Sequence, residues 1–370
     1  MPAKGPHLMD TLPIGWIAAL IGLSTGAILG LAARFGGFGT LSAIRAMRDM
    51  GDQRRVRAWG IAVGVAIVAT FTLESMGYVR ILATPAQAVL WTPWASVLGG
   101  LMFGYGMAMA GSCGFEALVR VGAGDLRALV IVAVLGISAM ALQAGPLAPL
   151  RDMAIPAQAA EMAQGVAHFL SWQVGRSPFF FAVIVAAVCI AMGLTYMPLR
   201  RAPSRLLWAV AVGLAVAFCL AGTTWVHEHT IAQVPVEGPD FAAPLGQAVQ
   251  FLIGPSDAST MLGAGLVGGV LLGGFIGATF RGFYRDHHRE ANPTLGRMAV
   301  GALLMGSGAV IAGGDLIGTG LSTMATLAWS APVAVISIML GTYLGRRWLV
   351  PEDVPGEIYD DGLDEDGYRV

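Results

Sequence analysis

The sequence predicts an all-α polytopic membrane protein, with about nine transmembrane or re-entrant helices and an internal pseudo-two-fold repeat. Three observations lead to this fold class. Of the 370 residues, 56% are hydrophobic and only 12% are charged, whereas a soluble domain carries about 25% charged residues. Several apolar runs reach the roughly 20 residues that a helix needs to cross a bilayer. A glycine-rich motif also occurs twice, beginning at Gly104 and at Gly306.

The apolar runs predict nine helices in chain order. The first run is too long for the hydrophobic region of a cleaved signal peptide, so we expect it to be a true span. Two of the nine segments are short and rich in glycine, and each ends at a polar cluster. The predicted segments are 13–33, 57–79, 95–112, 126–145, 178–197, 205–222, 259–280, 297–312 and 328–349.

Arginine clusters predict how the helices are oriented, because cytoplasmic loops are enriched in Lys and Arg. Such clusters lie near 34–57, 197–205 and 281–297, whereas 223–258 contains no Lys or Arg. We therefore expect a periplasmic N-terminus, cytoplasmic loops at the three clusters, and a cytoplasmic C-terminus. The last segment, 351–370, is acidic and rich in turn residues, which predicts a disordered cytoplasmic tail.

The repeat aligns GYGMAMAGSCGFEAL with GSGAVIAGGDLIGTG and places Cys113 opposite Asp315. With the expected orientation, the first copy runs inward and the second outward, as in an inverted repeat. Broken glycine-rich helices offer backbone amides and the positive end of a helix dipole to an anion. In hydrocarbon they occur only where the irregular backbone is buried in protein or lines a cavity.

A weaker match precedes each copy, between GAILGLAARF at 26–35 and GVLLGGFIGATFRGF at 269–283. Both of these helices are expected to run inward, whereas an inverted repeat would make them run in opposite directions. The predicted organisation has four parts. They are a first half with the cysteine motif (1–150), a region with two connecting spans and external loops (151–258), a second half with the aspartate motif (259–350), and the tail (351–370).

Candidate functional residues gather around the two glycine-rich motifs. Cys113 is either a path-lining thiol that donates a weak hydrogen bond to a sulfur-containing anion, or a small buried residue. Asp315 either binds a proton or a cation, or caps the short helix 316–324. Arg34 and Arg120 either raise the local anion concentration or anchor the cytoplasmic side. The candidate path residues are Cys113, Asp315, Gly111, Ser112, Gly114, Gly313, Gly314, Arg34 and Arg120.

Other polar residues favour structural interpretations. Glu116 lies four residues before Arg120, a spacing that suits an ion pair along a helix. Cys189 and Cys219 lie in the middle of apolar runs and are expected to pack. The three cysteines show no metal-binding spacing. The sequence contains no nucleotide-binding or nucleophile motif, so neither a cofactor nor a metal is expected.

Three motifs together resemble the YeeE/YedE family of bacterial inner-membrane proteins, which is associated with uptake of thiosulfate and related sulfur compounds. GSCGFEALVRVGAGDLRAL, from Gly111, is similar to the family's Gly-Gly-Cys signature. GLAARFGGFGTLSAIRAMRD at 30–49 resembles its first-helix motif, and AGGDLIGTGLS at 312–322 resembles its second Gly-Gly-Cys motif. Together these motifs span most of the chain.

The chain departs from the family pattern at two places. The family typically lines its path with cysteines at three positions, which are thought to pass the sulfur anion along by S–H hydrogen bonds. Only Cys113 matches. Gly36 and Gly37 occupy the first-helix position, and Asp315 occupies the position in the second half.

The resemblance implies a transporter or channel-like permease for a small sulfur-containing anion, thiosulfate or a related compound, in the bacterial inner membrane, and not an enzyme. The implied partners are that anion, the lipid bilayer and a cytoplasmic sulfur-carrier or regulator protein, without nucleic acid. An alternative is a membrane sensor or accessory subunit that binds a sulfur compound and signals to a cytoplasmic regulator. A third hypothesis, a persulfide-carrying enzyme, needs a thiolate at Cys113, which apolar surroundings disfavour.

Overall fold

The computed structural model describes residues 14–49, 51–155, 158–230, 234–254, 257–281 and 293–349. Within these ranges the secondary structure is helical, apart from two isolated bridges between extended residues. The tail predicted for 351–370 lies outside the described residues.

All nine predicted apolar segments are helices, which confirms the fold class. Six stretches of the described chain are long and apolar enough to cross a membrane. The nine helices are α1 (Ile14–Gly36), α3 (Arg54–Ser75), α5 (Pro93–Ala110), α7 (Ala128–Gln143), α10 (Pro178–Leu194), α12 (Pro203–His229), α14 (Ala258–Arg281), α15 (Leu295–Ala312) and α16 (Ser330–Leu349).

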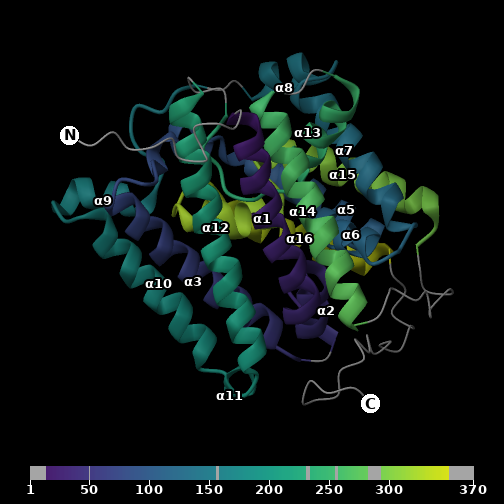
Figure 1. Ribbon diagram of the computed structural model, residues 1–370, viewed down its shortest axis with the longest axis horizontal. Helices are drawn as coiled ribbons and strands as arrows, with labels where there is room; N and C mark the ends of the chain where they lie inside the picture. Colours follow the sequence, from purple (N-terminus) through teal and green to yellow (C-terminus); the bar gives the residue numbers. More distant parts are fainter. Residues whose placement is uncertain are drawn as a thin grey trace, which may run out of the picture.

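Short helices connect these nine. Two of them, α6 and the π turn η3, follow the two glycine-rich motifs. In Figure 1, α2 and α11 lie on the lower side of the molecule and α8 on the opposite side. The short elements are α2 (Thr40–Asp49), η2 (Ile81–Ala83), α4 (Pro85–Ala88), α6 (Gly114–Gly122), α8 (Ala148–Ala154), α9 (Val166–Val174), α11 (Met197–Arg200), α13 (Ala242–Ile253) and η3 (Gly318–Thr323).

Helix α13 was not predicted from the sequence. It lies in 223–258, which was interpreted as a loop, and α12 also extends into this region as far as His229. The twelve residues of α13 carry no charge, but they are too few to cross a bilayer, which requires roughly 20 residues. A search for spans therefore passes over them. Helix α13 packs against α7 and α14, so it lies among the longer helices although it is too short to span the bilayer.

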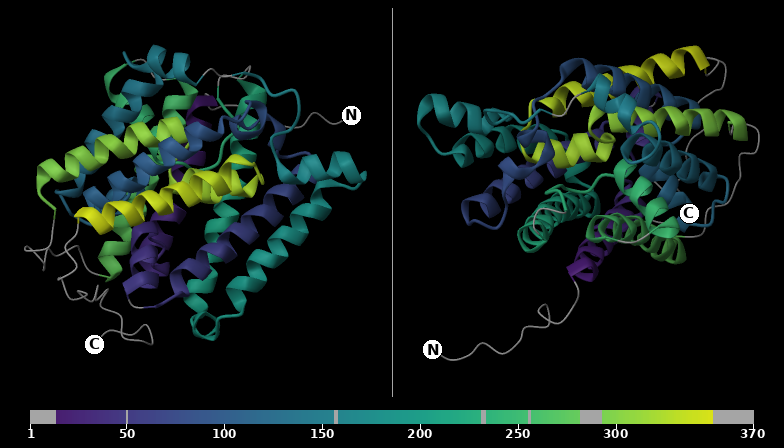
Figure 2. Two further views of the ribbon diagram at one scale, coloured as in Figure 1. Left: turned by 180° about the vertical axis from the view of Figure 1, so that it is seen from behind. Right: turned by 90° about the horizontal axis from the view of Figure 1, so that it is seen from above.

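The two glycine-rich helices pack on each other in antiparallel directions, as an inverted repeat requires. A side chain at Gly99 would touch Ala312, and one at Gly106 would touch Gly301. Both helices have 18 residues, and both end in a glycine with positive φ. Figure 2 shows α5 and α15 side by side with α16.

The helix contacts follow a two-fold pattern. The contact between α1 and α14 corresponds to the contact between α12 and α3. In the same way, the contact between α5 and α16 corresponds to that between α15 and α7. Likewise, α6 packs on α14 as η3 packs on α3, and α6 on α7 as η3 on α16. One exchange of helices describes these pairs. It replaces α1 with α12, α3 with α14, α5 with α15, α6 with η3 and α7 with α16, and it converts each contact named above into the other contact of its pair.

This exchange accounts for the parallel helices that the sequence left unexplained. Gly22 of α1 faces Leu266 and Gly30 faces Val270, so α1 and α14 run in the same direction. The helix before α15 is α14, and the corresponding helix before α5 is α3. The exchange therefore relates α14 to α3, and α1 and α14 are not counterparts in the repeat. Their sequences are similar because both helices use small residues to pack closely on each other.

We predict that Gly104→Ala destabilises the fold, because a Cβ there would collide with the carbonyl oxygen of Ile338 in α16. Overpacking of this kind costs about 1–3 kcal/mol. Gly268→Ala in α14 is the matched control, since a Cβ there meets nothing within 4 Å. Thermal unfolding in detergent should give a lower midpoint for Gly104→Ala only. Equal midpoints for the two variants would contradict the close contact of α5 and α16.

Candidate functional site

The first candidate site is the buried turn between α5 and α6. Helix α5 ends at Gly111, whose φ of 81° is in the left-handed region that favours glycine. Cys113 then adopts an extended backbone and caps α6: its Sγ accepts a hydrogen bond from the backbone N–H of Glu116 at 3.4 Å. Cys113 and Ser112 are both buried. The cysteine therefore lies at the positive end of a helix, as the candidate role requires.

The segment after α1 packs against this turn. The Thr40 hydroxyl donates a hydrogen bond to Cys113 Sγ at 2.8 Å. The backbone N–H of Ser42 donates to Glu116 Oε1 at 3.3 Å. Sequence reasoning missed Thr40, because 73 residues separate it from Cys113. The resemblance of 30–49 to a family motif was the one signal that marked this segment.

Glu116 and Arg120 do not form the predicted helix ion pair. Arg120 instead pairs with Asp125, with 2.6 Å between Nη2 and Oδ2, and the backbone N–H of Arg127 donates to the other oxygen of Asp125. Arg120 thereby fixes the turn that follows α6. The prediction failed because the buried carboxylate of Asp125 lies closer than Glu116, which faces Ser42 instead.

Arg34 lies in the last turn of α1 and packs beside Gly277 of α14. In the described part of the chain, no hydrogen bond or ion pair joins Arg34 or Arg120 to Cys113 or Asp315. Four of the candidate residues, Gly111 to Gly114, thus lie together in the turn. Arg34 and Arg120 lie in the last turns of α1 and α6.

The second candidate site is the turn between α15 and η3. Gly313 has φ 83° and Gly314 has φ 145°, values that side chains rarely adopt. The Asp315 carboxylate accepts a hydrogen bond from the backbone N–H of Gly318 at 2.7 Å. Asp315 therefore caps the short helix that follows, which is one of its two predicted roles. Its place in the repeat matches that of Cys113, which caps α6.

An extended segment before α13, residues 234–241, crosses the second turn; we call it the strap. Asp240 of the strap accepts a hydrogen bond from the backbone N–H of Asp315 at 2.9 Å. A Cβ at Gly318 would lie 2.5 Å from Asp240 Oδ1, so this approach requires glycine. Sequence reasoning missed Asp240, because the region was interpreted as a loop outside the membrane.

Side chains from two helical elements hold the strap in place. The Thr223 hydroxyl of α12 donates to the carbonyl of Glu237 at 3.0 Å. The Ser322 hydroxyl of η3 donates to the carbonyl of Pro239 at 2.6 Å. Because buried carbonyl groups need partners, these bonds allow an extended strand of chain to lie inside the protein.

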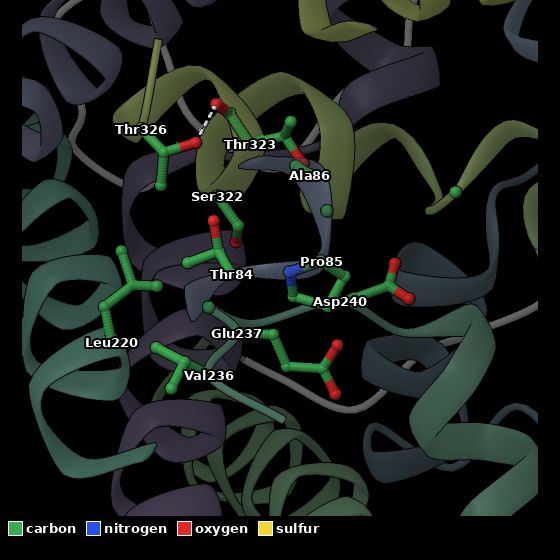
Figure 3. A pocket seen from close by; sticks show the side chains of 13 residues that line it. Thr84, Pro85, Ala86, Leu220, Val236, Glu237, Asp240, Ser322, Thr323 and Thr326 are labelled. Carbon is green, nitrogen blue, oxygen red and sulfur yellow. Dashed lines mark hydrogen bonds between the residues drawn. The ribbon is translucent and has the colours of Figure 1, made fainter. Parts of the chain in front are cut away.

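A cavity of about 70 Å³ lies beside the strap (Figure 3). Two acidic side chains, Glu237 and Asp240, line one part of it, and hydroxyl groups line another. Such a lining disfavours an anion. The lining residues are Thr84, Pro85, Ala86, Leu220, Val236, Glu237, Gly238, Asp240, Gly313, Gly318, Ser322, Thr323 and Thr326.

The two sites are close neighbours. The ring of Phe115, two residues after Cys113, packs on the ring of Phe241, which follows Asp240, with 4.9 Å between ring centroids. An aromatic contact thus joins the turn at Cys113 to the turn at Asp315.

We predict that stability falls as pH rises, because of Glu237, which lies between α12 and α13. Burial and the Asp240 carboxylate raise the pKa of Glu237 to about 8, from an ordinary value of about 4.3. The folded protein holds this proton more tightly, so its stabilising contribution is lost as pH rises through about 8. Melting curves between about pH 6 and pH 9 should show a smaller loss for Glu237→Gln than for wild type. Identical pH profiles would contradict the prediction.

Asp240→Ala should destabilise the protein more than Asp240→Asn does. Alanine leaves the N–H groups of Asp315 and Ala243 without their acceptor, which costs about 1–3 kcal/mol per buried group. Asparagine keeps an acceptor oxygen. Asp152→Ala, at an exposed aspartate, is the control. Thermal midpoints in detergent check the order, and a midpoint for Asp240→Ala equal to that of the control would show that the strap contact contributes nothing.

Comparisons with known proteins find similar sequences among transporters. The "Thiosulfate transporter TsuA" of Escherichia coli (strain K12) is 27% identical over 344 residues, covering 90% of this chain and 94% of that protein. The protein of the same name from Spirochaeta thermophila is 25% identical over 338 residues, covering 89% of this chain and 98% of its own length. The family model described as "Sulphur transport" matches residues 35–344, a range that includes both glycine-rich turns, the strap and the cavity. The chain therefore belongs to the sulphur transport family.

Proposed function

We propose that the protein transports a small sulfur-containing anion, thiosulfate or a related inorganic sulfur compound, across the bacterial inner membrane. The observation that carries this proposal is the buried turn at which a neutral thiol caps a helix inside a membrane protein of the sulphur transport family. Both relatives are named as thiosulfate transporters.

The turn at Cys113 has the chemistry that such an anion requires. The N-terminus of α6 presents backbone N–H groups and the positive end of a helix dipole. The thiol adds a weak, polarizable donor, and the buried hydroxyl of Ser112 has no hydrogen-bond partner in the described structure. These groups attract an anion without a full positive charge. Binding is therefore weak enough to allow release, as conduction demands.

The path we propose runs between two halves, 14–143 and 203–349, which the exchange of helix contacts relates. Gly111, Ser112, Cys113 and Gly114 line it in the first half. Gly313, Gly314 and Asp315 border it in the second half, where Asp315 and Asp240 give the neighbouring wall a negative charge. Because like charges repel, we place the anion beside the backbone N–H groups at the start of α6 and away from Asp240.

The arginines suit the approaches to this path. In the proposed topology the N-terminus is periplasmic and the C-terminus cytoplasmic, following the arginine-rich ends of the helices. Arg34 and Arg120 then lie toward the cytoplasmic side, where their charge raises the local anion concentration. A cytoplasmic sulfur-carrier or regulator protein is a fitting partner at this face, since it would receive the transported sulfur.

Uptake of radiolabelled thiosulfate into proteoliposomes tests the function. Wild type should accumulate it above empty vesicles, and Cys113→Ala should lose about tenfold or more in uptake, because the helix end loses its thiol donor. Cys189→Ala, at a half-buried cysteine of α10, is the matched control and should behave as wild type. Sulfate and sulfite are tested in parallel. Uptake of none of these anions by wild type would refute the proposal, and full activity of Cys113→Ala would refute the assigned path.

A further inference from the structure

The Cys113 sulfur receives two hydrogen bonds. The hydroxyl of Thr40 donates to Sγ at 2.8 Å, and the backbone N–H of Glu116 donates to it at 3.4 Å. A thiol carries one proton and can itself donate once. Because both neighbours act as donors, neither contact uses the S–H proton. With both neighbours donating to Sγ, the S–H proton remains available to a third group.

Thr40 is held firmly in this position. Helix α1 is followed by Gly37, whose φ of 63° suits glycine. The backbone N–H of Phe38 then donates a hydrogen bond to the carbonyl oxygen of Ala32 at 3.4 Å. The Phe38 ring stacks on Trp59 with 5.1 Å between centroids. On the other side, Ser42 bonds to Glu116. The Thr40 hydroxyl is therefore fixed relative to Cys113 from both ends of its segment.

Burial strengthens this arrangement. Thr40 is 2% exposed and Cys113 is 1% exposed, so water does not compete for either group. In such surroundings hydrogen bonds polarise one another. A sulfur that accepts a bond from Thr40 is therefore a better S–H donor toward a neighbouring anion.

We propose that Thr40 is a positioning residue, which holds the Cys113 thiol so that its S–H proton points at the transported sulfur-containing anion. This inference rests on the proposed function. Thr40 acts through Cys113 without touching the anion, and no covalent bond forms or breaks. A substitution that removes the hydroxyl should weaken anion binding even though Cys113 is still present.

Kinetics of thiosulfate uptake in proteoliposomes test the proposal with a graded set of variants. Thr40→Val removes the hydroxyl while keeping the shape, and it should raise KM about three- to tenfold, because the thiol loses the contact that directs its hydrogen bond to the anion. Thr40→Ser retains the hydroxyl and should stay within about twofold of wild type. Thr70→Val is the matched control, since Thr70 is a buried threonine whose hydroxyl has no partner in the described structure. If Thr40→Val does not fold, Thr40→Ala replaces it.

The infrared S–H stretching band gives a second readout that a merely structural role would not move. It is recorded in a Cys189→Ala, Cys219→Ala background, where Cys113 is the remaining cysteine. Added thiosulfate should shift the band to lower frequency with Thr40 or serine present, and should leave it unshifted in the valine or alanine variant.

The outcomes separate this inference from the proposed function. A wild type that transports thiosulfate, together with a hydroxyl-free variant whose KM and band shift match it, overturns the role of Thr40 alone. A wild type that transports none of the tested anions overturns the proposed function, and the positioning role with it. A raised KM in Thr40→Val, restored in Thr40→Ser, supports both.

Discussion

Two helix breaks inside an apolar protein are the constraint on which the rest of the structure depends. A helix that stops at Gly111 or at Gly313 leaves backbone N–H groups at the start of the next helix, and in hydrocarbon each unpaired group is costly. At each break the chain satisfies one of these groups with a side chain that caps the following helix, Cys113 in one copy and Asp315 in the other. Partners from distant segments, Thr40 and Asp240, then complete each turn.

The two copies share a backbone but differ in chemistry. Each has an 18-residue helix, a glycine with positive φ and a capping residue. The first copy places the Thr40 hydroxyl on its cap and the Glu116 carboxylate close by, whereas the second places the Asp240 carboxylate beside its cap, with Glu237 near it. An anion is attracted to helix amides and repelled by carboxylates, and the route that we propose therefore passes the N-terminus of α6 beside Cys113.

Much of the fold could be predicted from the sequence, because span length and the glycine repeat are local signals. The nine apolar helices follow from them, and the antiparallel course of α5 and α15 follows from the repeat together with the positions of the arginines. The strap, α13 and Thr40 could not be found this way, since each depends on contacts between distant segments. The Glu116–Arg120 pair failed for the same reason: helical spacing suggests a partner, while Asp125 and Ser42 arrive through the tertiary fold. Asp315 was aligned correctly, and its capping role needed the bond to Gly318.

Anion binding at the α6 turn is the central claim, and anomalous diffraction with selenosulfate tests it most directly. This analogue carries selenium in place of the terminal sulfur of thiosulfate, so its position is identified by element. The account predicts a selenium peak within hydrogen-bond distance of Cys113 Sγ, beside the N-terminus of α6, which is absent in a Cys113→Ala crystal. A peak in the acidic cavity between Glu237 and Ser322, with none beside Cys113, would contradict it.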